Sequence, residues 1–342
     1  MMTGRMEIET KFSKNINQRL SNEPDYMESF DVYMEADGKT ARTRLNYISN
    51  VLRFIHYLKD NGQPVDKIED LKNITADDVR KYVRDDDNRI LSEKGIISDS
   101  CKYLRHFSLN CFFSFLEDGN HIYKNPMEKI KTPKNDRLNK KLYLDIDEVK
   151  EIEKNAKTGN AAKDKIYMSQ WSERDAAIIN LGFETGLRVS AIVSINLDDI
   201  NLGEKYINTI EKGNRPRRVY LNKKTVKVLQ AWIQKRNEYL NEKDFDTQAL
   251  FITKRHTRIS PQTIGNVLRA YSGDLNNKGR IHPHTMRSSK ANNLYKITGD
   301  IEAVRVGLGH KYVSTTQKYV EDSIEKQKKI ANINLYGDDD DE

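Results

Sequence analysis

The chain has 342 residues, and its 58 lysines and arginines outnumber its 51 aspartates and glutamates to give a net charge of +7. No apolar run approaches the ~18 residues that a membrane-spanning helix needs, and no apolar secretion signal follows the first methionine, so we expect a cytoplasmic protein with no membrane partner. The two cysteines, Cys101 and Cys111, are too few for a disulfide framework or a cysteine-rich zinc module.

The charge is unevenly distributed along the chain. Residues 321–342 carry a net charge of −5, so the remainder carries +12. A basic body favours phosphate ligands, although basic composition alone is a weak signal of nucleic-acid binding.

The first part of the chain has the apolar spacing of helices. Residues 1–23 are polar and aperiodic, and we expect them to be disordered or extended. Apolar residues then recur at helical intervals and predict helices over 26–34, 43–58, 75–82 and 99–116. Asn125-Pro126 ends this pattern, because proline cannot continue a helix. We therefore predict an all-helical domain over 24–128.

A basic linker and a second domain follow. Residues 129–141 are polar and basic and include Pro133, a composition typical of a linker. The spacing of apolar residues then predicts helices over 174–183, 224–240, 260–271, 284–297 and 300–308 and from 314 onward. Alternating residues predict strands over 205–211 and 217–221, joined by a Lys-Gly-Asn turn. We predict a mixed α/β domain over 142–322 and a tail over 323–342 that is acidic at its end.

Four short motifs in the second domain carry candidate chemistry. They are an arginine one turn into a helix after a glycine turn (Glu184 to Arg188), a basic hairpin (Lys212 to Arg218), a histidine and an arginine on one helical face (His284 and Arg287), and Leu308-Gly-His310 followed nine residues later by Tyr319. Each has an ordinary alternative: an ion pair of Arg188 with Glu184, a solvated turn lysine, helix-capping side chains, or a packed tyrosine.

Together these side chains form a set suited to attack on a phosphodiester without a metal. Arginines neutralise the non-bridging oxygens, and a mobile lysine can protonate a leaving 5′ oxygen. Tyrosine, with a pKa of ~10, needs a base and a positive field to act as a nucleophile. His282 and His284 lack the third ligand that zinc would need, and no glycine-rich nucleotide loop is present, so we predict no cofactor.

The chain resembles the tyrosine recombinase family of phage integrases and Xer-like proteins through five features that occur in a fixed order. They are Thr-Gly-Leu-Arg, the hairpin lysine, His-x-x-Arg, Leu-Gly-His and the tyrosine that follows. The resemblance covers roughly residues 24–322. It implies that Arg188 and Arg287 clamp the phosphate, Lys212 is the general acid, His284 assists proton transfer, His310 hydrogen-bonds the phosphate, and Tyr319 is the nucleophile that forms a 3′-phosphotyrosyl link. Tyr312 and Tyr336 are the competing tyrosines, the first too close to His310 and the second in the tail.

The resemblance also implies a fold and partners. The expected fold is mainly α with a small antiparallel β-sheet, in which an all-helical core-binding (SAM-like) domain and a mixed α/β catalytic domain form a C-shaped clamp on DNA. The expected partners are double-stranded recombination sites and three further copies in a tetrameric synapse, and the need for an accessory directionality factor is left open. Apolar residues of the tail, from Ile324 to Leu335, are candidates for packing on a neighbouring copy.

Basic residues outside the catalytic set are candidate DNA contacts. Those on the polar sides of two helices in the first domain are Lys39, Arg42, Arg44, Arg53, Lys102 and Arg105, and those on the hairpin are Arg215, Arg217 and Arg218. Such contacts go largely to phosphate and sugar, so they do not disclose a target sequence. One departure from the family is Ala191, where an acid often stands, and Glu184 is a candidate to replace it.

The expected activity is ATP-independent site-specific recombination for integration or excision of a mobile element or phage. Three alternatives stay open: dimer resolution, a non-catalytic DNA-binding regulator on the same scaffold, and a type IB-like topoisomerase. The regulator would not need to retain the six candidate catalytic residues, and the topoisomerase would act without synapsis.

Overall fold

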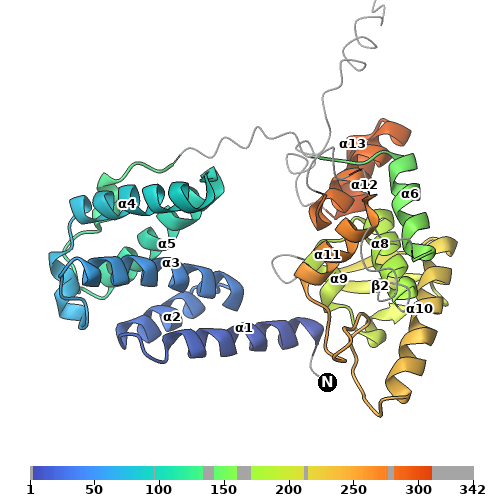
Figure 1. Ribbon diagram of the computed structural model, residues 1–342, viewed down its shortest axis with the longest axis horizontal. Helices are drawn as coiled ribbons and strands as arrows, with labels where there is room; N and C mark the ends of the chain where they lie inside the picture. The colour runs from blue at the N-terminus through green and yellow to red at the C-terminus, as the bar shows by residue number, and fades with distance from the viewer. Residues whose placement is uncertain are drawn as a thin grey trace, which may run out of the picture. The chain divides into compact units, whose positions relative to one another are not determined.

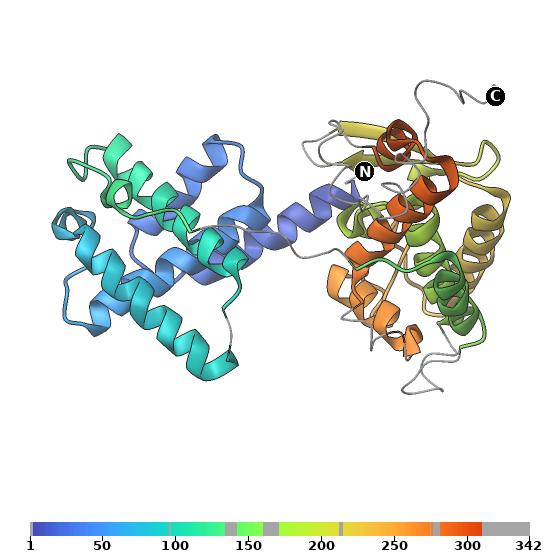
Figure 2. The same ribbon diagram turned by 90° about the horizontal axis from the view of Figure 1, so that it is seen from above.

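A computed structural model describes residues 3–95, 97–133, 142–159, 171–211, 215–273, 275 and 281–309. The chain divides into two compact units, Met1–Asn139 and Lys140–Glu342. Figure 1 shows the first unit in blue to green and the second in green to red, and Figure 2 shows the same elements from above. No helix among the described residues is long and apolar enough to cross a membrane.

The regular elements described in the first unit are all helices, as predicted. Its elements are α1 (Gly4–Leu20), α2 (Tyr26–Ala36), α3 (Ala41–Asp60), the 3-10 turn η1 (Ile68–Asn73), α4 (Ala76–Lys94), α5 (Asp99–Asp118) and the 3-10 turn η2 (Pro126–Lys129). Phe30, Phe54, Phe112 and Phe113 are fully buried in its core, and each contributes roughly 1.5–3 kcal/mol through burial.

Helix α1 corrects the expectation that residues 1–23 are disordered or extended. Thr3 caps the helix by accepting a hydrogen bond from the Met6 amide, and α1 packs against α3. Phe12, Ile16 and Leu20, spaced four residues apart, form the stripe that joins the core. The intervening residues are all polar, and the three apolar positions alone were too few to reveal this stripe in the sequence.

Helix α4 is longer than the predicted 75–82. Thr75 and Asp78 form a capping box, with the Thr75 amide donating to Asp78 Oδ2 at 2.9 Å. The helix continues to Lys94 and ends at Gly95, whose φ of 71° is favourable for glycine. Val79, Tyr82, Asp86 and Ile90 lie four residues apart or nearly so, and all four are buried.

The second unit is built around one buried helix. Its elements are α6 (Ile146–Lys157), α8 (Ser172–Thr185), α9 (Val189–Ser194), the 3-10 turn η3 (Leu197–Asp199), β1 (Ile200–Asn201), β2 (Tyr206–Glu211), β3 (Arg215–Tyr220), α10 (Lys223–Asn241), α11 (Pro261–Tyr271), α12 (Pro283–Thr298) and α13 (Ile301–Leu308). Residues 174–183 of α8 are all buried, and α6, α10 and α12 pack around it. A helix buried on every side reads as uniformly apolar rather than amphipathic.

Two features fix the surroundings of α8. Arg174 donates to Asp175 within the helix and to the Ile252 carbonyl at 3.1 Å, and the Tyr271 hydroxyl of α11 donates to Asp175 at 3.2 Å. Gly182 allows α12 to approach closely, because a Cβ at this position would overlap the Met286 side chain. This close approach places Arg287, the next residue of α12, beside the C-terminal end of α8.

The sheet has the strand order β1-β2-β3 and is antiparallel. The predicted hairpin is confirmed, with Tyr206 opposite Tyr220 and Glu211 opposite Arg215. The two-residue strand β1 was not predicted, because so short a segment shows no alternation. The connecting residues 212–214 lie outside the described residues, so the hairpin lysine is not placed.

Candidate active site

The first motif lies at the junction of α8 and α9. Gly186 ends α8 with a φ of 63°, and its amide donates to the Gly182 carbonyl at 3.0 Å. Arg188 was expected one turn into a helix, but it has extended backbone and occupies the N-cap position of α9. The difference arises because the left-handed glycine breaks the helix and α9 begins only at Val189.

Arg287 connects this junction to the end of α13. Its side chain is 1% exposed, and its Nη1 donates to the Gly186 carbonyl at 2.6 Å while its Nη2 donates to the Leu308 carbonyl at 2.8 Å. Both carbonyls lie at helix C-termini, where carbonyls lack helical partners and the helix dipole favours a cation. The guanidinium is therefore held in one orientation between two of the predicted motifs.

His284 lies one turn before Arg287, at the exposed start of α12. His282 occupies the N-cap position, and the two imidazole rings are near-parallel with centroids 6.4 Å apart. The predicted i and i+3 placement of His284 and Arg287 on α12 is confirmed. Among the described residues, no group of three or more histidine, cysteine or acidic side chains could hold a metal ion.

The hairpin meets the same end of α13 through Arg217. Its Nη2 donates to the Gly307 carbonyl at 2.8 Å and to the Val306 carbonyl at 3.4 Å. A Cβ on Gly186 would lie 2.6 Å from Leu308 Cδ2, so the α8 end also packs closely here. The structure thus brings together described parts of all four motifs, which are far apart in sequence. Lys212, His310 and Tyr319 themselves lie outside the described residues.

Two candidate DNA contacts in the first unit are placed differently from the prediction. Arg44 is 3% exposed, with Nη1 2.7 Å from Glu35 and Nε 3.4 Å from Asp31. Arg105 is 4% exposed, with Nη1 2.6 Å from Asp86 and Nη2 2.5 Å from Asp87. The expectation that these two side chains lie on a polar helix surface is wrong, because each is turned inward to acids on a neighbouring helix.

Asp86, one of the two acids that pair with Arg105, is held in its ionised form. Burial acts to raise the pKa of Asp86, but hydrogen bonds from Arg89 and Arg105 outweigh it and hold that pKa below its usual value. A buried carboxylate with two guanidinium partners joins α4 to α5. The role that the contacts support for Arg105 is structural.

The other basic candidates of this unit differ in exposure. Arg42 is exposed, with its guanidinium 5.6 Å from the centre of the Phe12 ring. Lys39 lies in the turn before α3, and its Nζ is 2.5 Å from Asp37 Oδ2. Lys102 is half-buried, and its Nζ is 3.9 Å from Asp87 Oδ2. Of these, Arg42 is the side chain most open to a phosphate.

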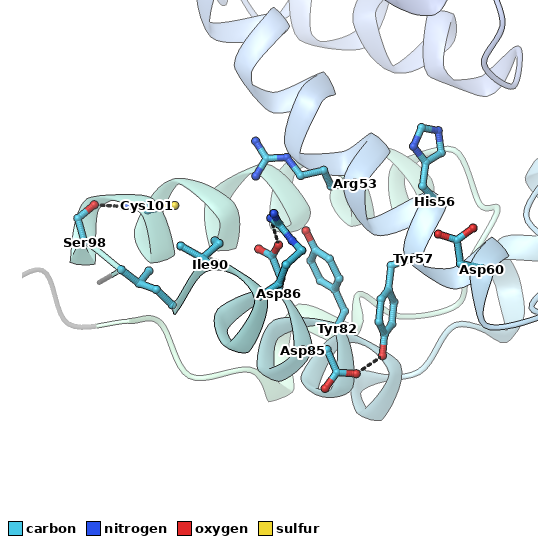
Figure 3. A pocket seen from close by; sticks show the side chains of 12 residues that line it. Arg53, His56, Tyr57, Asp60, Tyr82, Asp85, Asp86, Ile90, Ser98 and Cys101 are labelled. Atoms are coloured by element: carbon cyan, nitrogen blue, oxygen red, sulfur yellow. Dashed lines mark hydrogen bonds and ion pairs between the residues drawn. The ribbon is translucent and has the colours of Figure 1, made fainter. Parts of the chain in front are cut away.

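Arg53 lines a groove of about 890 Å³ between α3, α4 and α5. Figure 3 shows Arg53 facing the same groove as Asp85 and Asp86, with the Tyr57 hydroxyl donating to Asp85 at 2.7 Å. Asp60 and Arg89 line it as well. Carboxylates beside the guanidinium oppose the approach of a phosphate, so this groove is of mixed charge.

On the hairpin, Arg215 and Arg218 are exposed, and Arg217 is half-buried. The Arg218 guanidinium lies 4.0 Å from the centre of the Tyr206 ring. Sequence reasoning did not anticipate that Arg217 would bind backbone carbonyls. The sequence feature that could have indicated this is the alternation of side chains along β3, which places Arg217 on the same face as the buried Val219.

Comparisons with known proteins agree with this arrangement. The sequence model described as the phage integrase family matches residues 143–326. Tyrosine recombinase XerC of Syntrophus aciditrophicus is 27% identical over 308 residues, which cover 88% of this chain and 94% of that protein. The crystal structure of the XerH site-specific recombinase bound to palindromic difH substrate, a post-cleavage complex, has a TM-score of 0.63 at 18% identity and covers 88% of this chain and 82% of that one. A lambda integrase tetramer bound to a Holliday junction has a TM-score of 0.58 at 17% identity, covering 87% and 76%.

Proposed function

This chain belongs to the phage integrase family and is a tyrosine recombinase, and from that premise we propose that it integrates or excises a mobile element or phage at specific DNA sites. The observation that carries the catalytic part of the proposal is the buried Arg287 guanidinium, which hydrogen-bonds both the Gly186 turn and the end of α13. Arg287 belongs to one of the four motifs and contacts two others, and these motifs are those that the family uses on a phosphodiester.

The two arginines act on the scissile phosphate. Arg188 and Arg287 neutralise the non-bridging oxygens and the charge that builds on them as the phosphorus becomes five-coordinate. Because the carbonyls of Gly186 and Leu308 orient Arg287 before DNA arrives, little reorganisation is needed during the reaction.

Tyr319, Lys212 and the two histidines carry the bond changes. The Tyr319 hydroxyl oxygen attacks the phosphorus and loses its proton with the help of His284, while the bond from phosphorus to the 5′ oxygen breaks. Lys212 gives that oxygen its proton, and His310 hydrogen-bonds the phosphate. A 5′-hydroxyl of the partner strand reverses the step and releases tyrosine, so the phosphodiester is rebuilt without ATP.

The proposed assembly is four copies of the protein acting on two DNA duplexes in the cytoplasm. The tetrameric lambda integrase, whose fold this chain shares, supports that assembly state. Arg42, Arg215 and Arg218, which are exposed, are the proposed contacts to the DNA backbone.

Covalent trapping in cells tests the activity and the biological role together. Cells that express the protein are lysed in denaturant, and DNA linked to it is sequenced. We expect adducts at the two ends of a mobile element. Adducts at one chromosomal site in strains without such an element would assign dimer resolution instead.

The nucleophile is tested on a nicked suicide duplex of the recovered sequence. Tyr319→Phe should form no adduct, and Tyr312→Phe, the matched control, should form it at the normal rate. Absence of any adduct with the unaltered protein would contradict the catalytic proposal and favour a DNA-binding regulator.

A further inference from the structure

Arg217 occupies a different environment from the other two arginines of β3. Its backbone carbonyl accepts a hydrogen bond from Thr209 Oγ1 at 3.2 Å, in register with β2. Its side chain lies on the same face of β3 as Arg215 and the buried Val219 and is half-buried there, whereas Arg215 and Arg218 are exposed. From this position the guanidinium reaches the C-terminal end of α13.

The end of α13 is matched to this guanidinium. The last carbonyls of a helix lack helical partners, and a charged donor there forms a strong hydrogen bond. Arg217 supplies it to Gly307 at 2.8 Å, and Arg287 supplies one to the next carbonyl, that of Leu308, at 2.8 Å. Two arginines from different elements thus bind consecutive carbonyls.

Gly309 is shaped by the same contact. It ends α13 with a φ of 67°, and a Cβ there would lie 2.5 Å from Arg217 Nη1 and 2.7 Å from Cζ. The guanidinium therefore lies directly against the glycine Cα. A side chain at 309 would be strained by the backbone angle and would also push Arg217 away.

The contact joins the two segments that carry proposed catalytic groups. Lys212 precedes Arg217 by five residues on the hairpin, and His310 follows Gly309 immediately. We propose that Arg217 is a positioning residue, which ties the hairpin to the end of α13 so that Lys212 and His310 act on the same phosphate, and that it does not serve as a DNA contact. This inference rests on the proposed function.

Arg217→Ala tests it in single-turnover cleavage of the nicked suicide duplex. At saturating DNA the rate of adduct formation should fall roughly 10- to 100-fold, the scale of a small misplacement of reacting groups. The DNA dissociation constant and its slope against salt should stay within twofold of those of the unaltered protein. Arg217→Lys, which can reach one carbonyl, should recover part of the rate.

A substrate that needs no general acid separates the two ends of the contact. A sulfur in place of the bridging 5′ oxygen leaves without a proton, because a thiol has a pKa near ~8.5. If Arg217 positions Lys212, this substrate should restore most of the rate lost in Arg217→Ala. The defect of Arg188→Ala, which removes a phosphate clamp, should persist.

Two further variants guard against a folding artefact. Gly309→Ala keeps every cation yet should slow cleavage to a similar degree, and combining it with Arg217→Ala should add little, because both disturb one contact. Arg305→Ala removes an arginine of the same helix that pairs with Glu302, and it should cleave at the normal rate.

The outcomes distinguish this inference from the proposed function. If the unaltered protein forms no adduct, the proposed function fails. If the unaltered protein forms an adduct and Arg217→Ala cleaves equally fast, Arg217 is not a positioning residue. If Arg217→Ala cleaves normally at saturating DNA but its slope of log affinity against log salt is lower by about one, Arg217 contacts a phosphate instead.

Discussion

The arginines around the candidate site of the second unit bind different partners from two buried arginines of the first, although Arg174, elsewhere in the second unit, also pairs with a carboxylate. In the first unit Arg44 and Arg105 face carboxylates, and each pair cancels charge inside the domain. In the second unit Arg287 and Arg217 donate to backbone carbonyls at the end of α13, and those hydrogen bonds orient the guanidinium without adding a counter-charge. An arginine in a basic protein is therefore informative about phosphate only when its partner is known.

Carbonyl partners alone do not mark a site. Arg236 is 2% exposed, and its Nε donates to the Ala249 carbonyl at 2.8 Å, a position outside the four motifs. Burial lowers the pKa of this guanidinium from its usual value. What singles out Arg287 is that its two carbonyls belong to separate motifs, so one side chain orders both.

The largest effect should come from Arg287→Ala. Loss of an oriented cation at a phosphate, together with both carbonyl contacts, should slow adduct formation on the suicide duplex by roughly 10²–10³-fold or more at saturating DNA. Thermal unfolding is measured in parallel to register any loss of the fold. Arg287→Lys keeps the charge without the planar donors, and a normal rate in that variant would show that orientation by the two carbonyls is unimportant.

The next effect concerns stability alone. Arg105→Ala leaves Asp86 buried with one guanidinium fewer, and it should lower the free energy of unfolding of the first unit by roughly 3–5 kcal/mol, measured by urea denaturation. Arg84→Ala on the same unit breaks an exposed pair with Asp85, and because solvent screens that pair the free energy of unfolding should be nearly unchanged. Equal losses in the two variants would remove the distinction drawn for buried pairs.

Acid should weaken the first unit through the same carboxylate. Since the pKa of Asp86 in the folded chain is below the ordinary 3.8, the unfolded chain takes up the proton first as pH falls. The stabilisation is present above about pH 4 and is lost as pH falls through the lower, folded pKa. Urea denaturation at pH 5 and at pH 3 should show a smaller pH-dependent loss for Arg105→Ala than for the unaltered protein, and an equal loss would contradict this account.

The smallest effect should separate two arginines of α3. Arg42→Ala, at an exposed position, should lower the slope of log affinity against log salt by about 0.9 while the stability changes by less than about 0.5 kcal/mol. Arg44→Ala should leave that slope unchanged and destabilise the first unit. The reverse pattern would show that burial does not identify the DNA contact on this helix.

Local patterns were sufficient for much of the fold. The spacing of apolar residues predicted helices α2, α3 and α5, and alternation with a Lys-Gly-Asn turn predicted the hairpin of β2 and β3. The approach failed at α1, where only three apolar residues define the buried stripe, and at the far half of α4. Few apolar positions among many charges suffice once a neighbouring core covers them.

The candidate site was predictable by residue type and only partly by contact. Arg188, His284 and Arg287 were named from short motifs, but the N-cap position of Arg188 depends on a glycine that ends α8 before α9 begins. That Arg217 reaches Gly307 could not be predicted, because ninety residues separate the two and only the packing of β3 against α13 brings them together.

The amino-acid sequence by itself determined which chemical groups this protein carries, their order along the chain, and the helices and hairpin that present them, because these depend on local spacing and on side-chain chemistry. Only the tertiary structure decided which arginines are cancelled by carboxylates and which are oriented by carbonyls. The charge of a guanidinium is a property of the residue, whereas its partner depends on long-range packing of elements that no local pattern encodes.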